Sequence, residues 1–178
     1  LWAAGDVTGR TNTTHQGKYD ARVTGDAIAA RFGAGAGERA GAPTTGAGAD
    51  DPLRAWADRA AQPQVVFTRP EVAAVGLTEA AARAAGHRVR VVDVSFSSVG
   101  GTTVRGAGDD PGAVRIVVDE EREVLLGATF VGPEVAEMLH AATIAVVGEV
   151  PLRRLWHAVP AYPTRSEIWL RLLEAYGL

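Results

Sequence analysis

The chain has 178 residues and is rich in alanine and glycine, with 18 basic and 21 acidic side chains and a net charge of −3. At roughly 150 residues per domain, its length favours about one domain. The charge balance gives no electrostatic reason to bind nucleic acid or an anionic membrane. Because there is no cysteine, disulfides, thiolate nucleophiles and cysteine-based metal sites are excluded for this chain.

The chain has no signal-peptide pattern, and its longest strongly apolar run, Ala141 to Val147, is far shorter than the roughly 20 residues that span a bilayer. We therefore expect a soluble, cytoplasmic protein. Its first residues are apolar and lead directly into a turn at Gly5-Asp6, as at the end of a strand. This pattern indicates a piece of a longer protein.

Residues 1–32 form the first zone, with a turn followed by a helix predicted over 15–32. One apolar stripe is expected on this helix, at a spacing of four residues. It consists of Tyr19, Val23 and Ala27.

Residues 33–62 form a second zone. Residues 33–52 contain glycine, alanine and proline but no large apolar side chain, so they cannot repay the entropy of ordering, and we expect a flexible insertion. Asp51 and Pro52 then predict the start of a short helix. The glycines at 33–37 follow a helix rather than a strand, which argues against a dinucleotide-binding loop.

Residues 63–178 carry most of the predicted core. Strands are expected where apolar residues cluster or alternate, at 65–67, 73–75, 92–96, 114–118 and 124–130. Helices are expected at 78–85, from Pro133 to Gly148, after Pro151, and from Thr164 to Tyr176. Strands and helices without regular βαβ alternation predict an α+β fold with an antiparallel sheet.

No two of the four histidines stand three or four residues apart, so we expect no metal site. Two segments attract attention instead. The turn at Gly5-Asp6 could present the Asp6 carboxylate to a ligand hydroxyl. In residues 160–167 two prolines fix the backbone around Tyr162, and Thr164 with Glu167 has the spacing of a helix capping box.

Three segments together resemble the pyridine nucleotide-disulfide oxidoreductases, the flavoproteins that include dihydrolipoamide dehydrogenase and mercuric reductase. Residues 1–6, LWAAGD, resemble the second flavin-binding motif of that family. Residues 65–79, VVFTRPEVAAVGLTE, look like the opening of its C-terminal dimerisation domain. Residues 162–167, YPTRSE, are similar to its C-terminal His-Pro-Thr-x-x-Glu segment.

The resemblance implies that residues 1–32 are the end of an FAD-binding domain and that 63–178 are the dimerisation domain. It implies that Gly5 and Asp6 bind FAD, with Asp6 at a ribityl hydroxyl. Thr14 and His15 match the helix start whose backbone approaches the flavin, where the helix dipole would stabilise negative charge. The cofactors of the parent protein would be FAD and NAD(P)H, which this piece alone is not expected to retain.

Tyr162 departs from the family pattern, because many members have histidine there, paired with the residue at Glu167. A phenol titrates near 10 and an imidazole near 6.5, so the phenol is a poor acid–base substitute at neutral pH. This makes a metal ion, a quinone or a nicotinamide more plausible as the small-molecule acceptor than a disulfide. Assigning the histidine role to His157 would break the Pro-Thr-x-Ser-Glu register, so we reject it.

The leading hypothesis is the C-terminal part of an FAD-dependent NAD(P)H oxidoreductase, with Tyr162 and Glu167 as its catalytic residues and no activity in this piece alone. We also expect a homodimer through residues 63–178, since helix 133–148 and the last helix carry apolar residues outside a single stripe. The resemblance also implies a two-fold interface on this domain, in which Tyr162 and Glu167 would complete the partner's site. The alternative hypothesis is a stand-alone, non-catalytic dimerisation or interaction module.

Overall fold

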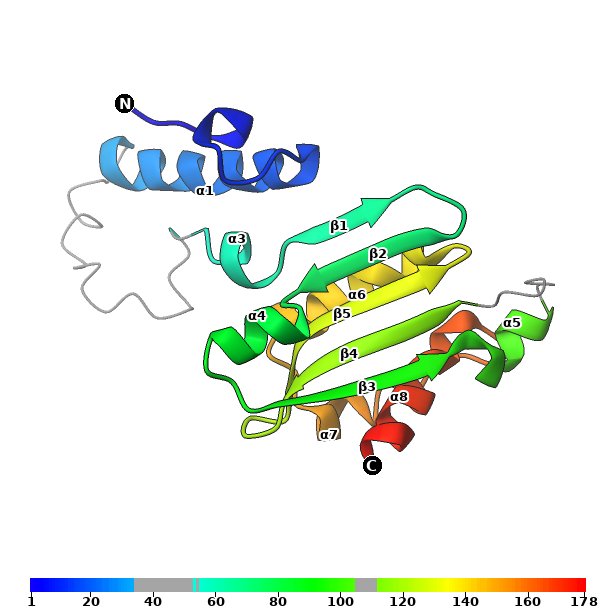
Figure 1. Cartoon of the computed structure of the whole chain (residues 1–178). Helices are drawn as coiled ribbons and strands as arrows, with labels where there is room; N and C mark the ends of the chain where they lie inside the picture. The colour runs from blue at the N-terminus through cyan, green and yellow to red at the C-terminus, as the bar shows by residue number, and fades with distance from the viewer. Residues whose placement is uncertain (34–52, 54, 105–111) are drawn as a thin grey trace. The chain divides into compact units, whose positions relative to one another are not determined.

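The computed structural model describes residues 1–33, 53, 55–104 and 112–178 (Figure 1). These residues form two compact units, Leu1–Arg59 and Ala60–Leu178, and each is treated by itself. All of the expected flexible insertion at 33–52 except Gly33 lies outside the described residues, as does the helix start at Asp51-Pro52. In the described part, no helix combines the length and the apolar character needed to cross a membrane.

The first unit is built on the long helix α1, Thr14–Phe32, which is preceded by the short 3-10 helix Gly5–Thr8. The predicted helix is present, and Tyr19, Val23 and Ala27 lie half-buried on its less exposed side. The two buried residues on that side, Gln16 and Asp20, are polar and were not expected there.

The polar residues of α1 are buried because they form a charged cluster with Arg10 and Asp58. The Arg10 guanidinium lies 3.2 Å from an Asp20 oxygen and 2.9 Å from an Asp58 oxygen. Gln16 also donates a hydrogen bond to Asp58. Asp58 belongs to the short helix α3, Ala57–Ala60, so the cluster connects the chain after the insertion to α1.

The second unit contains a five-stranded antiparallel sheet with strand order β1-β2-β5-β4-β3. Its strands are β1 Pro63–Val66, β2 Glu71–Gly76, β3 Val89–Ser95, β4 Ala113–Asp119 and β5 Val124–Gly132. The predicted α+β class with an antiparallel sheet is confirmed.

Helices cover both faces of this sheet (Figure 1). They are α4 Glu79–Ala84, α5 Gly100–Val104, α6 Val135–Val147, α7 Leu152–Leu155 and α8 Ile168–Tyr176. On one face Ala82 of α4 packs in a cluster with Val89, Val117 and Leu126. On the other face α6 contacts β2 and β5, while Trp169 of α8 packs against Phe130 at 6.2 Å between ring centroids.

Helix α6 differs from its prediction in two ways. It begins at Val135, two residues after Pro133, and the Glu71 carboxylate caps it by accepting a hydrogen bond of 3.2 Å from the Ala136 amide. Its core face also contains residues that the sequence pattern placed outside the main stripe, whereas Met138 is only half-buried. The buried residues of α6 are Val135, Leu139, Ala142, Ala145 and Val146.

Asp119 is a buried carboxylate that organises the turn between β4 and β5. Its oxygens accept hydrogen bonds from the amides of Glu121, at 3.0 Å, and Arg122, at 3.3 Å, and one oxygen lies 3.0 Å from His87 Nδ1. Burial on its own would raise the pKa of Asp119, but the bonds to His87 and to the two amides outweigh it and lower that pKa. The ionised form is therefore favoured in the folded protein.

We expect Asp119→Asn to lower the free energy of unfolding by about 1–3 kcal/mol at neutral pH, since a buried, bonded charge is lost. Folding lowers the pKa of this carboxyl, so the carboxyl stabilises the folded protein at pH values above its unfolded pKa of about 3.9. This contribution to the free energy of unfolding is lost as the pH falls through the folded pKa. Urea unfolding at a series of pH values should show that the difference in unfolding free energy between the wild type and Asp119→Asn becomes smaller in acid.

The control is Asp93→Asn. Asp93 pairs with Arg115 at 2.7 Å, but its side chain is 57% exposed, so its loss should cost less than about 1 kcal/mol. Equal losses in the two variants, or a deficit of Asp119→Asn that grows in acid, would contradict the account of Asp119.

Candidate functional site

The predicted turn at Gly5-Asp6 is present in the first unit. Gly5 has φ +76°, a left-handed conformation that favours glycine. The turn is held by a hydrogen bond of 2.7 Å from the Thr8 hydroxyl to the Gly5 carbonyl and one of 3.0 Å from the Gly9 amide to the Asp6 carbonyl. The Asp6 side chain is exposed, so its carboxylate is available to a ligand.

The turn lies close to the start of α1. A Cβ placed on Gly17 would lie 3.5 Å from the Gly5 Cα, so two glycines let the backbones approach. Thr13, the N-cap residue of α1, makes no side-chain capping bond, and within the described residues its buried hydroxyl oxygen has no hydrogen-bond partner. Thr14 and His15 are the first two residues of α1 and stand at the positive end of its helix dipole.

The C-terminal segment does not form the predicted capping box. The Thr164 hydroxyl donates to the Ala161 carbonyl at 2.6 Å and makes no capping bond to the 3-10 helix Arg165–Glu167. Glu167 is half-buried, and its Oε2 has no hydrogen-bond partner among the described residues. The structural role that the sequence offered for Glu167 is therefore absent.

Tyr162 and Glu167 instead converge on Gly100, the first residue of α5. From the position that a Cβ on Gly100 would occupy, the Tyr162 hydroxyl lies at 3.6 Å and the Glu167 Oε2 at 3.8 Å. Tyr162 is 79% exposed, so its phenol is open to a ligand while the Glu167 oxygen is not. The two proposed catalytic side chains are thus neighbours.

Arg165, between these two residues, anchors the segment to the core. Its guanidinium carbon lies 4.0 Å from the ring centroid of Phe96, which is fully buried, and Arg165 is itself only 6% exposed. A cation over an aromatic face at this distance is a favourable contact, stronger when desolvated. It holds the segment against the chain that precedes α5.

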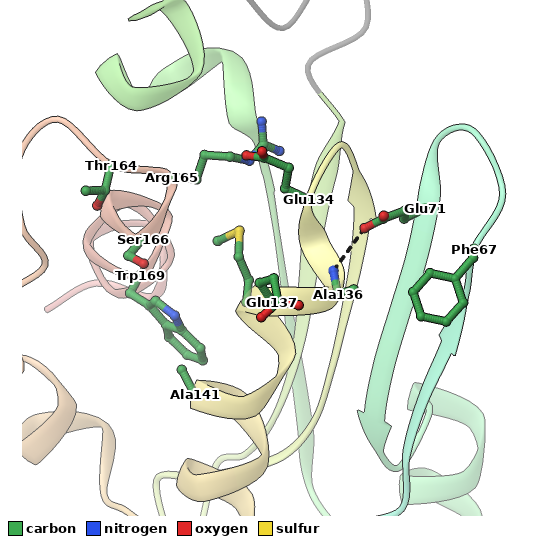
Figure 2. Close-up of a pocket in the computed structure, with 11 residues that line it drawn as sticks. Phe67, Glu71, Glu134, Ala136, Glu137, Ala141, Thr164, Arg165, Ser166 and Trp169 are labelled. Atoms are coloured by element: carbon green, nitrogen blue, oxygen red, sulfur yellow. Dashed lines mark hydrogen bonds between the residues drawn. The ribbon is translucent and has the colours of Figure 1, made fainter. Parts of the chain in front are cut away.

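A pocket of about 530 Å³ lies beside this segment (Figure 2). It is lined by acidic, aromatic and aliphatic side chains from the β1–β2 hairpin, α6 and the segment leading into α8. These include Phe67, Glu71, Glu137, Met138 and Trp169. Neither Tyr162 nor Glu167 lines it, and Glu71 is already used to cap α6, as the dashed line in Figure 2 shows.

Other candidates find little support in the geometry. Within the described residues, no three histidine, aspartate or glutamate side chains are arranged to hold a metal ion. His157 lines a separate pocket with Arg153, Trp156 and the last two residues. It is therefore not part of the group formed by Tyr162, Glu167 and Gly100.

Sequence reasoning missed the residues that support the candidate sites. Gly17, Gly100 and Gly101 allow close backbone approaches, and Arg165 stacks on Phe96. The adjacent glycines at 100–101, four residues after the strand predicted at 92–96, were an available signal. An arginine next to a motif gives no sign that it will be buried.

Comparison with known proteins identifies the family of this chain. Residues 62–172 match the model of the pyridine nucleotide-disulphide oxidoreductase dimerisation domain. The dihydrolipoyl dehydrogenase of Rhizobium etli is 32% identical over 178 residues, which cover 99% of this chain and 32% of that protein. The dihydrolipoyl dehydrogenase of Chlamydia muridarum is 29% identical over 169 residues, covering 95% of this chain and 31% of that protein.

Solved structures show the same relationship. The HOCl-induced flavoprotein disulfide reductase RclA from Escherichia coli superposes with a TM-score of 0.73 at 25% identity, covering 98% of this chain and 35% of that one. LpdA from Mycobacterium tuberculosis gives a TM-score of 0.75 at 21% identity, a likeness of fold, over 99% of this chain and 34% of that one. The chain spans about a third of the length of these relatives. It belongs to the pyridine nucleotide-disulphide oxidoreductase family and contains that family's dimerisation domain.

Proposed function

We propose that this chain is the C-terminal portion of an FAD-dependent NAD(P)H oxidoreductase, with Tyr162 and Glu167 at the site where the acceptor is reduced. The observation that carries the proposal is the convergence of these side chains on Gly100, with a buried Glu167 oxygen that lacks a hydrogen-bond partner in the described structure. A buried polar atom left without a protein partner needs an explanation, and a catalytic role beside Tyr162 provides one. The family membership of the chain supports the same reading.

The first unit fits FAD. The exposed Asp6 carboxylate, held on a glycine turn, suits a sugar-like hydroxyl as a charge-assisted acceptor. The start of α1, at Thr14 and His15, places the positive end of the helix dipole and the Thr13 hydroxyl beside an electron-rich edge of a ligand. When bound, FAD supplies the capacity to take a hydride from nicotinamide and to pass electrons onward.

At the second site, the exposed Tyr162 phenol can donate a hydrogen bond to a ligand, and the buried Glu167 Oε2 lies near it. A phenol holds its proton at neutral pH, so Tyr162 orients and polarises an acceptor rather than shuttling protons as an imidazole does. This favours an acceptor that needs orientation more than rapid protonation. We propose a metal ion, a quinone or a nicotinamide rather than a dithiol–disulfide couple.

The test of the cofactor proposal uses the full-length parent protein. It should purify with bound flavin, and NADH or NADPH should bleach the flavin absorbance under anaerobic conditions. Asp6→Asn should weaken FAD binding by about tenfold to a hundredfold, because a charge-assisted hydrogen bond is worth about 1.5–3 kcal/mol. Equilibrium titration of the apoprotein with FAD, followed by absorbance, gives both dissociation constants.

Asp26→Asn is the matched control, since Asp26 is an exposed aspartate on α1 away from the turn. It should leave FAD affinity unchanged. A parent protein that is colourless and takes up no FAD on reconstitution would overturn the proposal. If that protein still associates specifically with itself, the non-catalytic interaction module becomes the better reading.

We further propose that the chain forms a homodimer through residues 63–178, with α6 as part of the contact. The expectation of spare apolar residues on α6 needs correction, since Leu139 and Val146 are only 4% exposed and belong to the core. Ile144, 57% exposed, and Val147, 48% exposed, remain on the outer side of α6, with the exposed Ala141 one turn before. Exposed apolar rows of this kind favour burial against a partner.

Ile144→Glu should convert the dimer into a monomer, because it places a charge in an apolar contact. Leu172 is unsuitable for this test, since it is fully buried in its own protomer and a glutamate there would disrupt the fold. Sedimentation velocity of the wild-type chain at micromolar concentrations should show a discrete dimer. The control, Ile28→Glu on α1, should keep it, and a wild-type monomer would contradict the proposal.

A further inference from the structure

We propose that Gly100 is a positioning residue that sets the place of the Tyr162 phenol, and that the segment 96–101 is the platform for the whole C-terminal site. The inference rests on the proposed function, because it matters to catalysis only if Tyr162 meets the acceptor. Its geometric content stands on the contacts of the second unit alone.

Three contacts join the platform to the C-terminal segment. Phe96 lies under the Arg165 guanidinium at 4.0 Å. A Cβ on Gly101 would lie 2.2 Å from the carbonyl carbon of Thr164, so these backbones touch with no room for a side chain. Gly100 faces Tyr162 and Glu167 themselves, and α5 and the 3-10 helix Arg165–Glu167 lie in contact.

The contact with Tyr162 is the tightest that a side chain at position 100 would make. A Cβ on Gly100 would lie 3.2 Å from the Tyr162 Cε2, closer than carbon atoms normally approach at their optimal separation of about 3.5–4.0 Å. The phenol ring of Tyr162 therefore packs directly against Gly100. Since Tyr162 is largely exposed, few other contacts hold the ring in place.

Any side chain at position 100 would push the ring outward by a few tenths of an ångström or more, while Glu167 Oε2, at 3.8 Å, could stay. The substitution would thus separate the hydrogen-bond donor from the acceptor. A displacement of about 1 Å in a reacting group can cost about a hundredfold in rate, so a smaller shift should cost about tenfold. Gly100 has no side chain that could take part in the reaction, so it affects turnover only through the position of Tyr162.

The decisive measurement is a double-mutant comparison in the full-length flavoprotein, using Gly100→Ala in the wild-type and Tyr162→Ala backgrounds. Turnover with a quinone acceptor should fall about tenfold for Gly100→Ala in the wild-type background. In the Tyr162→Ala background the same change should alter turnover by less than about twofold, since no ring is left to displace. A loss of equal size in both backgrounds, or no loss in the wild type, overturns the proposal.

A second measurement needs no activity. The chain has three tyrosines, so 3-fluorotyrosine labelling gives three fluorine resonances, of which Tyr162→Phe identifies one. Gly100→Ala should shift the Tyr162 resonance and leave those of Tyr19 and Tyr176 in place. An unshifted Tyr162 resonance overturns the proposal.

Gly25→Ala is the control for both measurements, because a Cβ there meets nothing within 4 Å and Gly25 lies in α1. It should change neither turnover nor the Tyr162 resonance. If Gly100→Ala does not fold, Gly100→Ala/Tyr162→Ala should fold because the clash is removed, and its failure to fold overturns the proposal.

The two proposals fail separately. A wild-type parent that binds no flavin ends the proposed function, whereas the fluorine resonances still decide whether Gly100 positions Tyr162. Normal flavin reduction by nicotinamide in Gly100→Ala, with only the acceptor step slowed, supports both. Slowed flavin reduction in Gly100→Ala would show that the residue acts elsewhere and would overturn the positioning role.

Discussion

The burial of β5 on both faces is the constraint on which the second unit depends. This strand pairs with β2 on one side and β4 on the other, and nearly all of its residues are buried. A strand in that position needs apolar cover above and below, which α4 provides on one face and α6 and α8 on the other. The other strands and the helices of this unit are therefore arranged so that the central apolar strand β5 is shielded from solvent.

The candidate site follows from how α8 is held on that sheet. Trp169 packs on Phe130 of β5, and the four residues before the helix must then pass close to the end of β3. There Arg165 stacks on Phe96, and two glycines make room for the segment. The core of the unit thus fixes the direction from which Tyr162 and Glu167 reach the surface.

The chemistry of the site depends on which side-chain polar groups are not used in local hydrogen bonds. The Thr164 hydroxyl donates its hydrogen bond to the Ala161 carbonyl, so Thr164 and Glu167 do not form a capping box. A carboxylate oxygen with no hydrogen-bond partner in the described part of the chain then lies beside an exposed phenol. One donor and one acceptor side by side suit binding and orienting a polar acceptor, and a charged loop or metal cluster is not needed for that role.

The sequence by itself determined the local structure and the family motifs. Alternating apolar residues located β3, β4 and β5, and the helix predicted at 78–85 is present, capped by the Thr78 hydroxyl, which accepts a bond of 3.2 Å from the Ala81 amide. These features depend on residues a few positions apart, which a linear pattern contains. The same is true of the glycine turn at Asp6 and of the Tyr-Pro-Thr segment.

The tertiary structure alone decided which side chains are buried and which bonds they choose. Gln16 and Asp20 are buried because Arg10 and Asp58 meet them, and the latter is 42 positions away from Gln16. The expected capping box at Glu167 is absent because the Thr164 hydroxyl bonds to the Ala161 carbonyl instead, and the importance of Gly100 depends on a ring 62 positions later in the chain. Such choices are settled by contacts between distant segments, and periodicity along one segment carries no information about them.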